Sequence, residues 1–333
     1  MSPPKYPPKN KWSWRSQAFR ALVYQIVAVA VIVLVVFYLA NNTATNMRAR
    51  GIQSGFDFLN SAAGFDIGES LFPFDSGESY WRAYFVGLVN TLRVAVIGII
   101  FTTILGTLIG VGRFSRNALI RGLCTAYVEF FRNIPVLLQL LMWYLFFTEM
   151  LPMSTEPISV GSFFLSKGGI NFPIPLWDAW AWDIPKQGEF AIEGGGAVSP
   201  EYMALLLGLT IYTAAFVAEV VRGGIQSVSA GQLEAASALG LSRWLSIRLV
   251  MLPQALRVII PPITNQYLNL TKNSSLAVAI GYPDVVSIAN TAINQTGRAV
   301  ECIAIIMLVY LSTSLSTSLF MNWYNARAAI KER

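Results

Sequence analysis

Long apolar stretches without charge determine what this chain can fold into. Residues 21–40, ALVYQIVAVAVIVLVVFYLA, form a charge-free run that as a helix is about 30 Å long, enough to cross a membrane's hydrocarbon core. Only 13% of the residues are charged, against about 25% in soluble proteins. A transmembrane β-barrel would instead show alternating segments of about ten residues. We therefore predict an all-α, polytopic membrane protein with about six transmembrane helices, at 21–40, 83–112, 119–147, 200–222, 253–275 and 299–322.

The beginning of the chain has two parts. Residues 1–20 combine four prolines with five basic side chains, so we expect a tail that is disordered or lies at the membrane surface, with Trp12 and Trp14 at the headgroups. The apolar run 21–40 is longer than the roughly 7–15 residues of a signal peptide, and no clear small-x-small cleavage site follows it. We therefore predict a retained first span and not a cleaved leader.

Basic residues predict the orientation. They flank the spans in the tail 1–20, in the loop 113–121 and in the tail 323–333, and the positive-inside rule places these segments in the cytoplasm. The same alternation puts 223–252 in the cytoplasm. Because the net charge of +6 is explained by this flanking pattern, we expect no nucleic-acid partner.

The composition also excludes several kinds of chemistry. The chain has no histidine, which rules out a Ser-His-Asp triad and a histidine-ligated metal. It has no phosphate-binding loop of the type Gly-x-x-x-x-Gly-Lys-Ser/Thr, so any ATP is bound elsewhere. Cys124 and Cys302 lie within or beside apolar runs, where we expect them to pack as small apolar side chains. We therefore expect no catalytic residues, no metal site and no cofactor bound by this chain.

A short polar segment interrupts the apolar sequence at 234–253, EAASALGLSRWLSIRLVMLP. Ser229 and Gln232 could form a capping box for a first helix, Gly240 could end that helix in the left-handed conformation, and Ser242 could cap a second. The segment therefore predicts a helix-turn-helix. Its spacing resembles the EAA loop of ABC-importer permeases, and the residues that carry the resemblance are Glu234, Ala235, Ala236, Gly240, Leu252 and Pro253.

Other segments extend this resemblance over about 200 residues. They look like the polar-amino-acid branch of these permeases, close to the general L-amino acid and the glutamate/glutamine/aspartate/asparagine systems, and they are 87–115, 127–147, 207–236 and 269–277. The resemblance implies a five-helix type I permease core within residues 83–322, in a bacterial inner membrane, with the span 21–40 as an addition. It also implies a homologous second permease, an ATPase dimer that binds ATP and magnesium, and a periplasmic amino acid-binding protein. A heterodimer is expected, with a homodimer still open.

The segments 41–82 and 148–199 then face the periplasm as long loops. The prolines and acids of 170–182 and its flank argue against a seventh span and favour an aromatic layer at the outer interface. Either loop could shape a docking surface for a substrate-delivering protein, or could merely elaborate the helix ends.

Polar groups inside the span 119–147 are candidates for a substrate pathway. Glu129 and Arg132 share a helical face, where they could neutralise each other or face a cavity. Pro135 removes the donor to the carbonyl of Phe131, so we expect either a packing kink or a discontinuous helix that restarts near Asn133. The positive end of such a half-helix suits the carboxylate of an amino acid, and Gln139 lies one turn deeper.

A second polar group lies late in the span 253–275, where Lys272, Asn273, Ser274 and Ser275 could bind a carboxylate or satisfy broken backbone. Three further features are expected to be structural. Glu219 and Arg222 repeat the three-residue spacing near a helix end. Arg93 and Glu301 should each pair with another helix or a partner subunit. The small residues Gly106, Gly110 and Gly112 should allow close helix packing.

Together these features favour a non-catalytic transmembrane subunit of an ABC importer for polar L-amino acids. An ion-coupled secondary transporter is the alternative suggested by Glu129 and the broken span. A membrane anchor or sensor that binds amino acids without moving them is the third. The preferred amino acids, and which permease holds the substrate site, are left open by the sequence.

Overall fold

The structure is a computed structural model that describes residues 14, 16–51, 53–176, 180–189 and 191–328. Most of the tail assigned to 1–20, and the last residues of the tail 323–333, therefore lie outside the described residues. The chain divides into two compact units, residues 1–55 and 56–333.

The first unit contains α1, Gln17–Ala49. This helix is longer than the predicted span 21–40 and takes in the polar residues that were assigned to the following loop. Its polar turn is supported by side chains four residues apart, because Thr45 donates to the carbonyl of Asn41 and Asn46 donates to the side chain of Asn42. None of the 33 residues of α1 is buried, which is typical of a helix surrounded by lipid or by another subunit.

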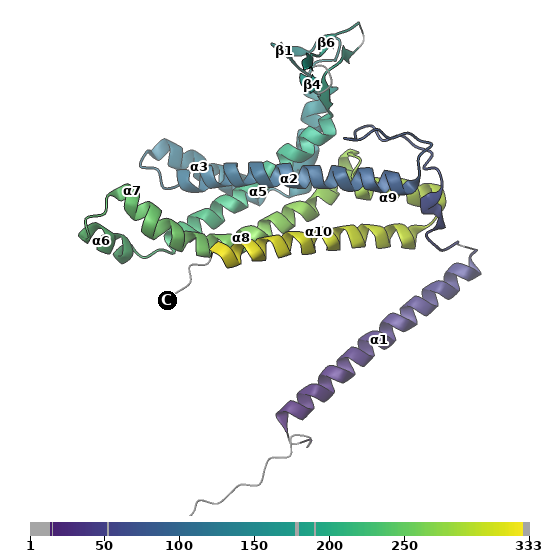
Figure 1. Cartoon of the computed structure of the whole chain (residues 1–333), viewed down its shortest axis with the longest axis horizontal. Helices are drawn as coiled ribbons and strands as arrows, with labels where there is room; N and C mark the ends of the chain where they lie inside the picture. The colour runs from purple at the N-terminus through teal and green to yellow at the C-terminus, as the bar shows by residue number, and fades with distance from the viewer. Residues whose placement is uncertain (1–13, 15, 52, 177–179, 190, 329–333) are drawn as a thin grey trace, which may run out of the picture. The chain divides into compact units, whose positions relative to one another are not determined.

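The second unit is a bundle of apolar helices (Figure 1). Five helices of the described chain are long and apolar enough to cross a membrane, or six if one bent pair counts as a single span, which confirms the polytopic all-helical prediction. The elements of the bundle, in chain order, are α2 Tyr80–Gly112, α3 Ala118–Asn133, α4 Val136–Leu145, the π-helical turn η2 Phe146–Met150, α5 Pro200–Gln226, α6 Ala230–Ala238, α7 Arg243–Ser246, the π-helical turn η3 Ile247–Met251, α8 Leu252–Asn273, the 3₁₀ segment η4 Ser274–Ile280, α9 Val285–Thr296 and α10 Ala299–Ala328.

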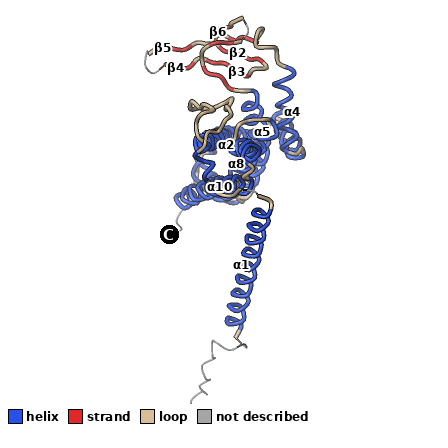
Figure 2. Tube along the Cα trace, turned by 90° about the vertical axis from the view of Figure 1, so that its right-hand side faces the viewer, coloured by secondary structure: helices blue, strands red, loops and turns tan. Residues whose placement is uncertain are grey.

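Short strands form a small β head on the long segment between η2 and α5 (Figure 2). The bounds are β1 Ile158–Val160, β2 Phe163–Ser166, β3 Gly169–Phe172, β4 Ile174–Leu176, β5 Ala181–Asp183, β6 Lys186–Gln187, β7 Ile192–Glu193 and β8 Gly196–Val198. An antiparallel sheet has the order β1-β2-β3-β8, and β4-β5 and β6-β7 form two separate pairs. The sequence prediction of an irregular loop missed these strands, although no further span is present among its described residues, as expected.

Close packing joins α2 to α5. A Cβ added at Gly106 would lie 2.6 Å from the side chain of Val217, and one at Gly110 would lie 2.8 Å from the carbonyl oxygen of Ala218. A Cβ at Gly112 would lie 2.6 Å from the sulfur of Cys124, which packs there as a small apolar side chain. The structure therefore confirms the expected role of these glycines in close helix packing.

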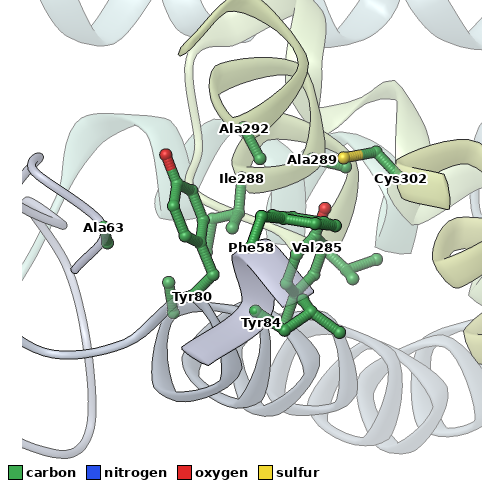
Figure 3. Close-up of a cluster of buried hydrophobic side chains, with 11 residues drawn as sticks. Phe58, Ala63, Tyr80, Tyr84, Val285, Ile288, Ala289, Ala292 and Cys302 are labelled. Carbon is green, nitrogen blue, oxygen red and sulfur yellow. The ribbon is translucent and has the colours of Figure 1, made fainter. Parts of the chain in front are cut away.

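The loop 56–79 is held against α2, α9 and α10 by a cluster of buried side chains (Figure 3). Its 3₁₀ turn η1, Asp57–Asn60, inserts Phe58, whose ring meets the edge of Tyr80 with centroids 5.5 Å apart, and Cys302 is buried in the same cluster. Beside it, Arg298 binds Asp57 with two hydrogen bonds of 2.9 and 3.1 Å. These bonds from the Arg298 guanidinium hold the pKa of Asp57 below its usual range. The segment is thus a packed part of the second unit.

Candidate functional site

The segment 229–252 contains two helices separated by a tight turn. The first helix, α6, ends in a Schellman motif, in which Leu241 N–H donates to the carbonyl of Ala236 and Gly240 N–H to that of Ser237. Gly240 adopts a φ of +77°, a conformation that only glycine takes up readily. Ser242 then caps α7 by accepting from Leu245 N–H. The predicted left-handed turn and second cap are confirmed.

The predicted capping box at the start of α6 is wrong. The Ser229 side chain makes no capping hydrogen bond, and the Gln232 amide oxygen instead accepts from the Gln254 side chain in α8, at 3.4 Å. The Gln232 side chain reaches across to α8, so a tertiary contact takes the place of the local one. The second helix also continues through η3 into α8, so Leu252 and Pro253 lie inside a continuous helix.

The outer surface of this turn presents one acid among apolar side chains. Glu234 and Ala235 are exposed on α6, whereas Ala236 is buried and fixes the helix to the bundle. Leu239 is 82% exposed and Trp244 is 65% exposed, so the tip of the turn carries uncovered apolar area. Such a combination suits contact with another protein.

An ion cluster holds the helices immediately before this turn. Glu219 in α5 forms salt bridges with Arg222 on the same helix and with Arg113 at the end of α2, and Arg222 also donates to Gln226. The structural role expected for Glu219 and Arg222 is confirmed, and Arg113 is the partner that sequence reasoning missed. The cluster ties the end of α2 to the segment that leads into α6.

The broken span is the second candidate site. α3 and α4 are bent by 102° at Ile134 and Pro135, so the expected break is present. The buried Gln139 donates from its amide nitrogen to the carbonyls of Phe131 and Ile134, both at 2.9 Å. Gln139 therefore satisfies two backbone acceptors at the break.

The other polar residues of the break face outward. Glu129, Arg132 and Asn133 are exposed, and no salt bridge joins Glu129 to Arg132 in the described chain. Instead, the Arg132 guanidinium lies 5.2 Å from the ring centroid of Phe216 in α5, and Asn133 donates to the carbonyl of Glu129 at 2.6 Å. The mutual neutralisation considered for the charged pair is thus absent within this chain.

The polar group of α8 lies where the helix tightens into η4, a segment that contacts α4. The hydroxyls of Ser274 and Ser275 donate to the carbonyls of Thr271 and Lys272, both at 2.7 Å. Asn273 is half-buried, and Lys272 is exposed. In this structure the two serines satisfy local backbone, and Lys272 is the cation that faces outward.

Arg93 was expected to pair with another helix or a partner subunit; it does contact another helix, α5, but its ion-pair partner lies in a loop. The Arg93 guanidinium pairs with Glu69 of the loop 56–79 at 2.5 Å and stacks over Tyr202, 4.1 Å from the ring centroid. Glu69 also accepts from Ser199 N–H at the start of α5. Glu69 lies 24 residues before Arg93, in a segment predicted to be a loop. No helical or strand spacing relates the two residues, so the sequence could not predict this contact.

A helix that the sequence reading missed, α9, begins at a buried acid. Asp284 caps it by accepting from Ser287 N–H at 2.8 Å, and Tyr310 donates to its other oxygen. Burial raises the pKa of Asp284 to about 6. Asp284 and the left-handed Gly297 are start and stop signals that could have revealed this helix.

Residues 102–330 match the family described as the binding-protein-dependent transport system inner membrane component. The chain belongs to this permease family. The match includes the broken span α3–α4, the helix-turn-helix segment 229–252, called the α6–α7 turn, and most of the chain up to α10. It does not include α1.

Two relatives that are named as permeases match nearly the whole chain, and a third matches about two thirds of it. The general L-amino acid transport system permease AapQ of Rhizobium johnstonii is 44% identical over 97% of this chain and 96% of its own length. The glutamate/glutamine/aspartate/asparagine permease BztB of Rhodobacter capsulatus is 36% identical over 95% of both chains. The glutamate/aspartate import permease GltJ of Escherichia coli K12 is 32% identical over 66% of this chain and 77% of its own.

Solved structures support the same fold. A crystal structure of an amino acid ABC transporter with histidines matches with a TM-score of 0.56 and 25% identity, over 74% of this chain and 95% of the other. The inward-facing methionine transporter MetNI matches with a TM-score of 0.53 and 18% identity, a likeness in fold alone. By homology and fold, the protein is an ABC importer permease for amino acids, a membrane protein with several spans and a translocation component.

Proposed function

We propose that this permease carries polar L-amino acids across the bacterial inner membrane, powered by a separate ATPase that docks on the α6–α7 turn. The observation that carries the proposal is the turn itself. A rigid Schellman turn holds the exposed Glu234 and the uncovered Leu239 and Trp244 at one end of the bundle. Relatives that match at least 95% of the chain are named as amino acid permeases, which supports the substrate class.

The turn would transmit motion because it is continuous with the spans. α7 runs through η3 into α8, and the Glu219–Arg113 bridge ties α5 to α2 just before α6. An ATPase that pulls on the turn would therefore move several spans together. ATP binding and hydrolysis can change the balance between the inward-open and outward-open states only if the ATPase makes different contacts in each state. In this proposal Glu234, Ala235 and Gly240 would make those contacts.

The substrate path would run past the broken span. The exposed Glu129, Arg132 and Lys272 are charged groups that can face a partner permease, while Gln139 and Pro135 keep the break rigid. The proposed assembly contains a homologous second permease, an ATPase dimer that binds ATP and magnesium, and a periplasmic amino acid-binding protein. In this orientation both tails and the α6–α7 turn lie in the cytoplasm, and the β head and the loop 56–79 lie in the periplasm.

Cross-linking from position 234 tests the docking. A photo-reactive amino acid at 234 in the assembled transporter is expected to capture the ATPase, and one at Trp180 in the β head, which is fully exposed, is expected not to. Capture from both positions or from neither would contradict the docking. Uptake by vesicles that hold an ion gradient but no ATPase would favour a secondary transporter instead.

A further inference from the structure

A large apolar cavity, open on one side, lies between helices of the bundle next to the α6–α7 turn, and the proposed function does not use it. Its volume is about 1270 Å³, and its lining comes from α2, α3, α5, α6, α7, η3, α8 and α10. This exceeds the roughly 300–1,000 Å³ of a small-molecule pocket, so an amino acid would not fill it. The walls are mostly aliphatic, with side chains such as Val111, Leu256 and Ile263.

The two ends of the cavity differ in polarity. At the end farther from the turn, the Tyr267 and Thr103 hydroxyls are 2.7 Å apart and bond each other, so that end needs no polar occupant. At the end beside the turn, Arg243 lines the cavity without an ion-pair partner among the described residues. Ser246 is only 5% exposed, and its hydroxyl has no hydrogen-bond partner there.

We propose that this cavity binds an anionic phospholipid, with its phosphate at Arg243 and Ser246 and its acyl chains between α2, α5, α8 and α10. An unpaired guanidinium and an unsatisfied hydroxyl at one end, followed by a long aliphatic interior, fit a ligand with an anionic head and an apolar body. Because the walls belong to membrane-spanning helices, such lipids have direct access.

The charge of the site argues against the first helix of the chain as the occupant. α1 carries no acidic residue, so it could fill the apolar interior but could not neutralise Arg243.

The position of the site suggests its role. Leu233 and Ser237 of α6 are part of the lining, so a bound lipid would pack against α6 and stabilise the position of the α6–α7 turn. Only the assignment of the headgroup to the cytoplasmic leaflet rests on the proposed function.

Native mass spectrometry of the full-length chain, purified in mild detergent from membranes that contain phosphatidylglycerol, tests the site. We expect about one anionic phospholipid per chain. Arg243→Gln should lower this occupancy about tenfold or more, because a charge-assisted contact is lost. The matched control is Arg248→Gln, since Arg248 is exposed on the following turn and does not line the cavity.

A second variant tests the interior. Val111→Trp should displace the acyl chains and lower occupancy about tenfold. Val96→Trp, on the same helix with 55% exposure against 51% for Val111, should leave it unchanged. Three results would each overturn the proposal. The two arginine variants could retain the same amount of lipid, the bound lipid could be zwitterionic, or position 111 could cross-link to another protein chain. Unchanged lipid binding in a chain that fails to transport would leave it intact, so the two proposals fail separately.

Discussion

The side-chain amide of Gln139 donates a hydrogen bond to the carbonyl of Phe131, eight residues earlier in the chain. This is the carbonyl that Pro135 deprives of its helical donor, so the chain carries its own replacement for the bond that the proline removes. The same amide also reaches the carbonyl of Ile134. One buried side chain thus makes a 102° break tolerable inside an apolar region.

Replacing Gln139 should therefore destabilise the break. Gln139→Met keeps a similar volume but leaves two carbonyls unsatisfied, and we expect a loss of about 1–3 kcal/mol in the free energy of unfolding. Thermal unfolding of the purified protein measures this. Gln25→Met, at an exposed position of α1, is the control and should change the unfolding midpoint little. Equal midpoints for the two variants would show that Gln139 does not support the break.

The ion pair that anchors the loop 56–79 provides a second prediction. The side chains of Arg93 and Glu69 are only 14% and 9% exposed, so Glu69→Gln should leave a buried charge unpaired and cost about 3–5 kcal/mol. Glu78 pairs with Arg82 at the surface, where both side chains are about 40% exposed, and Glu78→Gln should cost less than about 1 kcal/mol. Chemical or thermal unfolding compares them. Similar losses in both variants would contradict the anchoring role of Glu69.

The close approach of α2 and α5 provides a third prediction. Gly110→Ala would place a Cβ 2.8 Å from the backbone oxygen of Ala218, which cannot move without shifting α5, so we expect a loss of about 1–3 kcal/mol. Gly122→Ala has open space around it in α3 and should be neutral or slightly stabilising. Unfolding midpoints distinguish the two, and a Gly110→Ala variant as stable as Gly122→Ala would be inconsistent with the packing.

Asp284 predicts a pH dependence. Its folded pKa of about 6 lies above the usual value of 3.8, so the folded state holds the proton more tightly. Stability at this site is therefore greatest below pH 4, falls as pH rises to about 6, and is constant above that, with a total change of about 3 kcal/mol. Asp284→Asn keeps the cap on Ser287 N–H and abolishes the titration.

The variant and the natural protein should thus have similar unfolding midpoints at pH 4, and the variant should be the more stable at pH 7. Because all other groups titrate in both proteins, the difference between their midpoints isolates Asp284. A difference that does not change with pH would contradict the assignment.

The parts that the sequence predicted are those with local causes. Apolar length specified the spans, Pro135 specified the break, and Gly240 with Ser242 specified the turn. What it did not predict depends on distant contacts. Gln139 was predicted to line the substrate pathway, and in the structure its side chain donates to backbone carbonyls. The ion pair between Glu69 and Arg93 depends on the loop 56–79 packing against α2, which the sequence does not reveal. The β head has strands of two to four residues, too short to show alternation.

ATP-driven uptake by a Glu234→Lys variant is the most direct test of the central claim, that the α6–α7 turn links this permease to its ATPase. The variant should unfold at the same temperature as the natural protein, because Glu234 is exposed, and should lose uptake of labelled glutamate or glutamine at least tenfold. Glu156→Lys, an equal charge reversal at an exposed site beside the β head, should retain uptake. Uptake by Glu234→Lys within twofold of the natural protein would contradict the account.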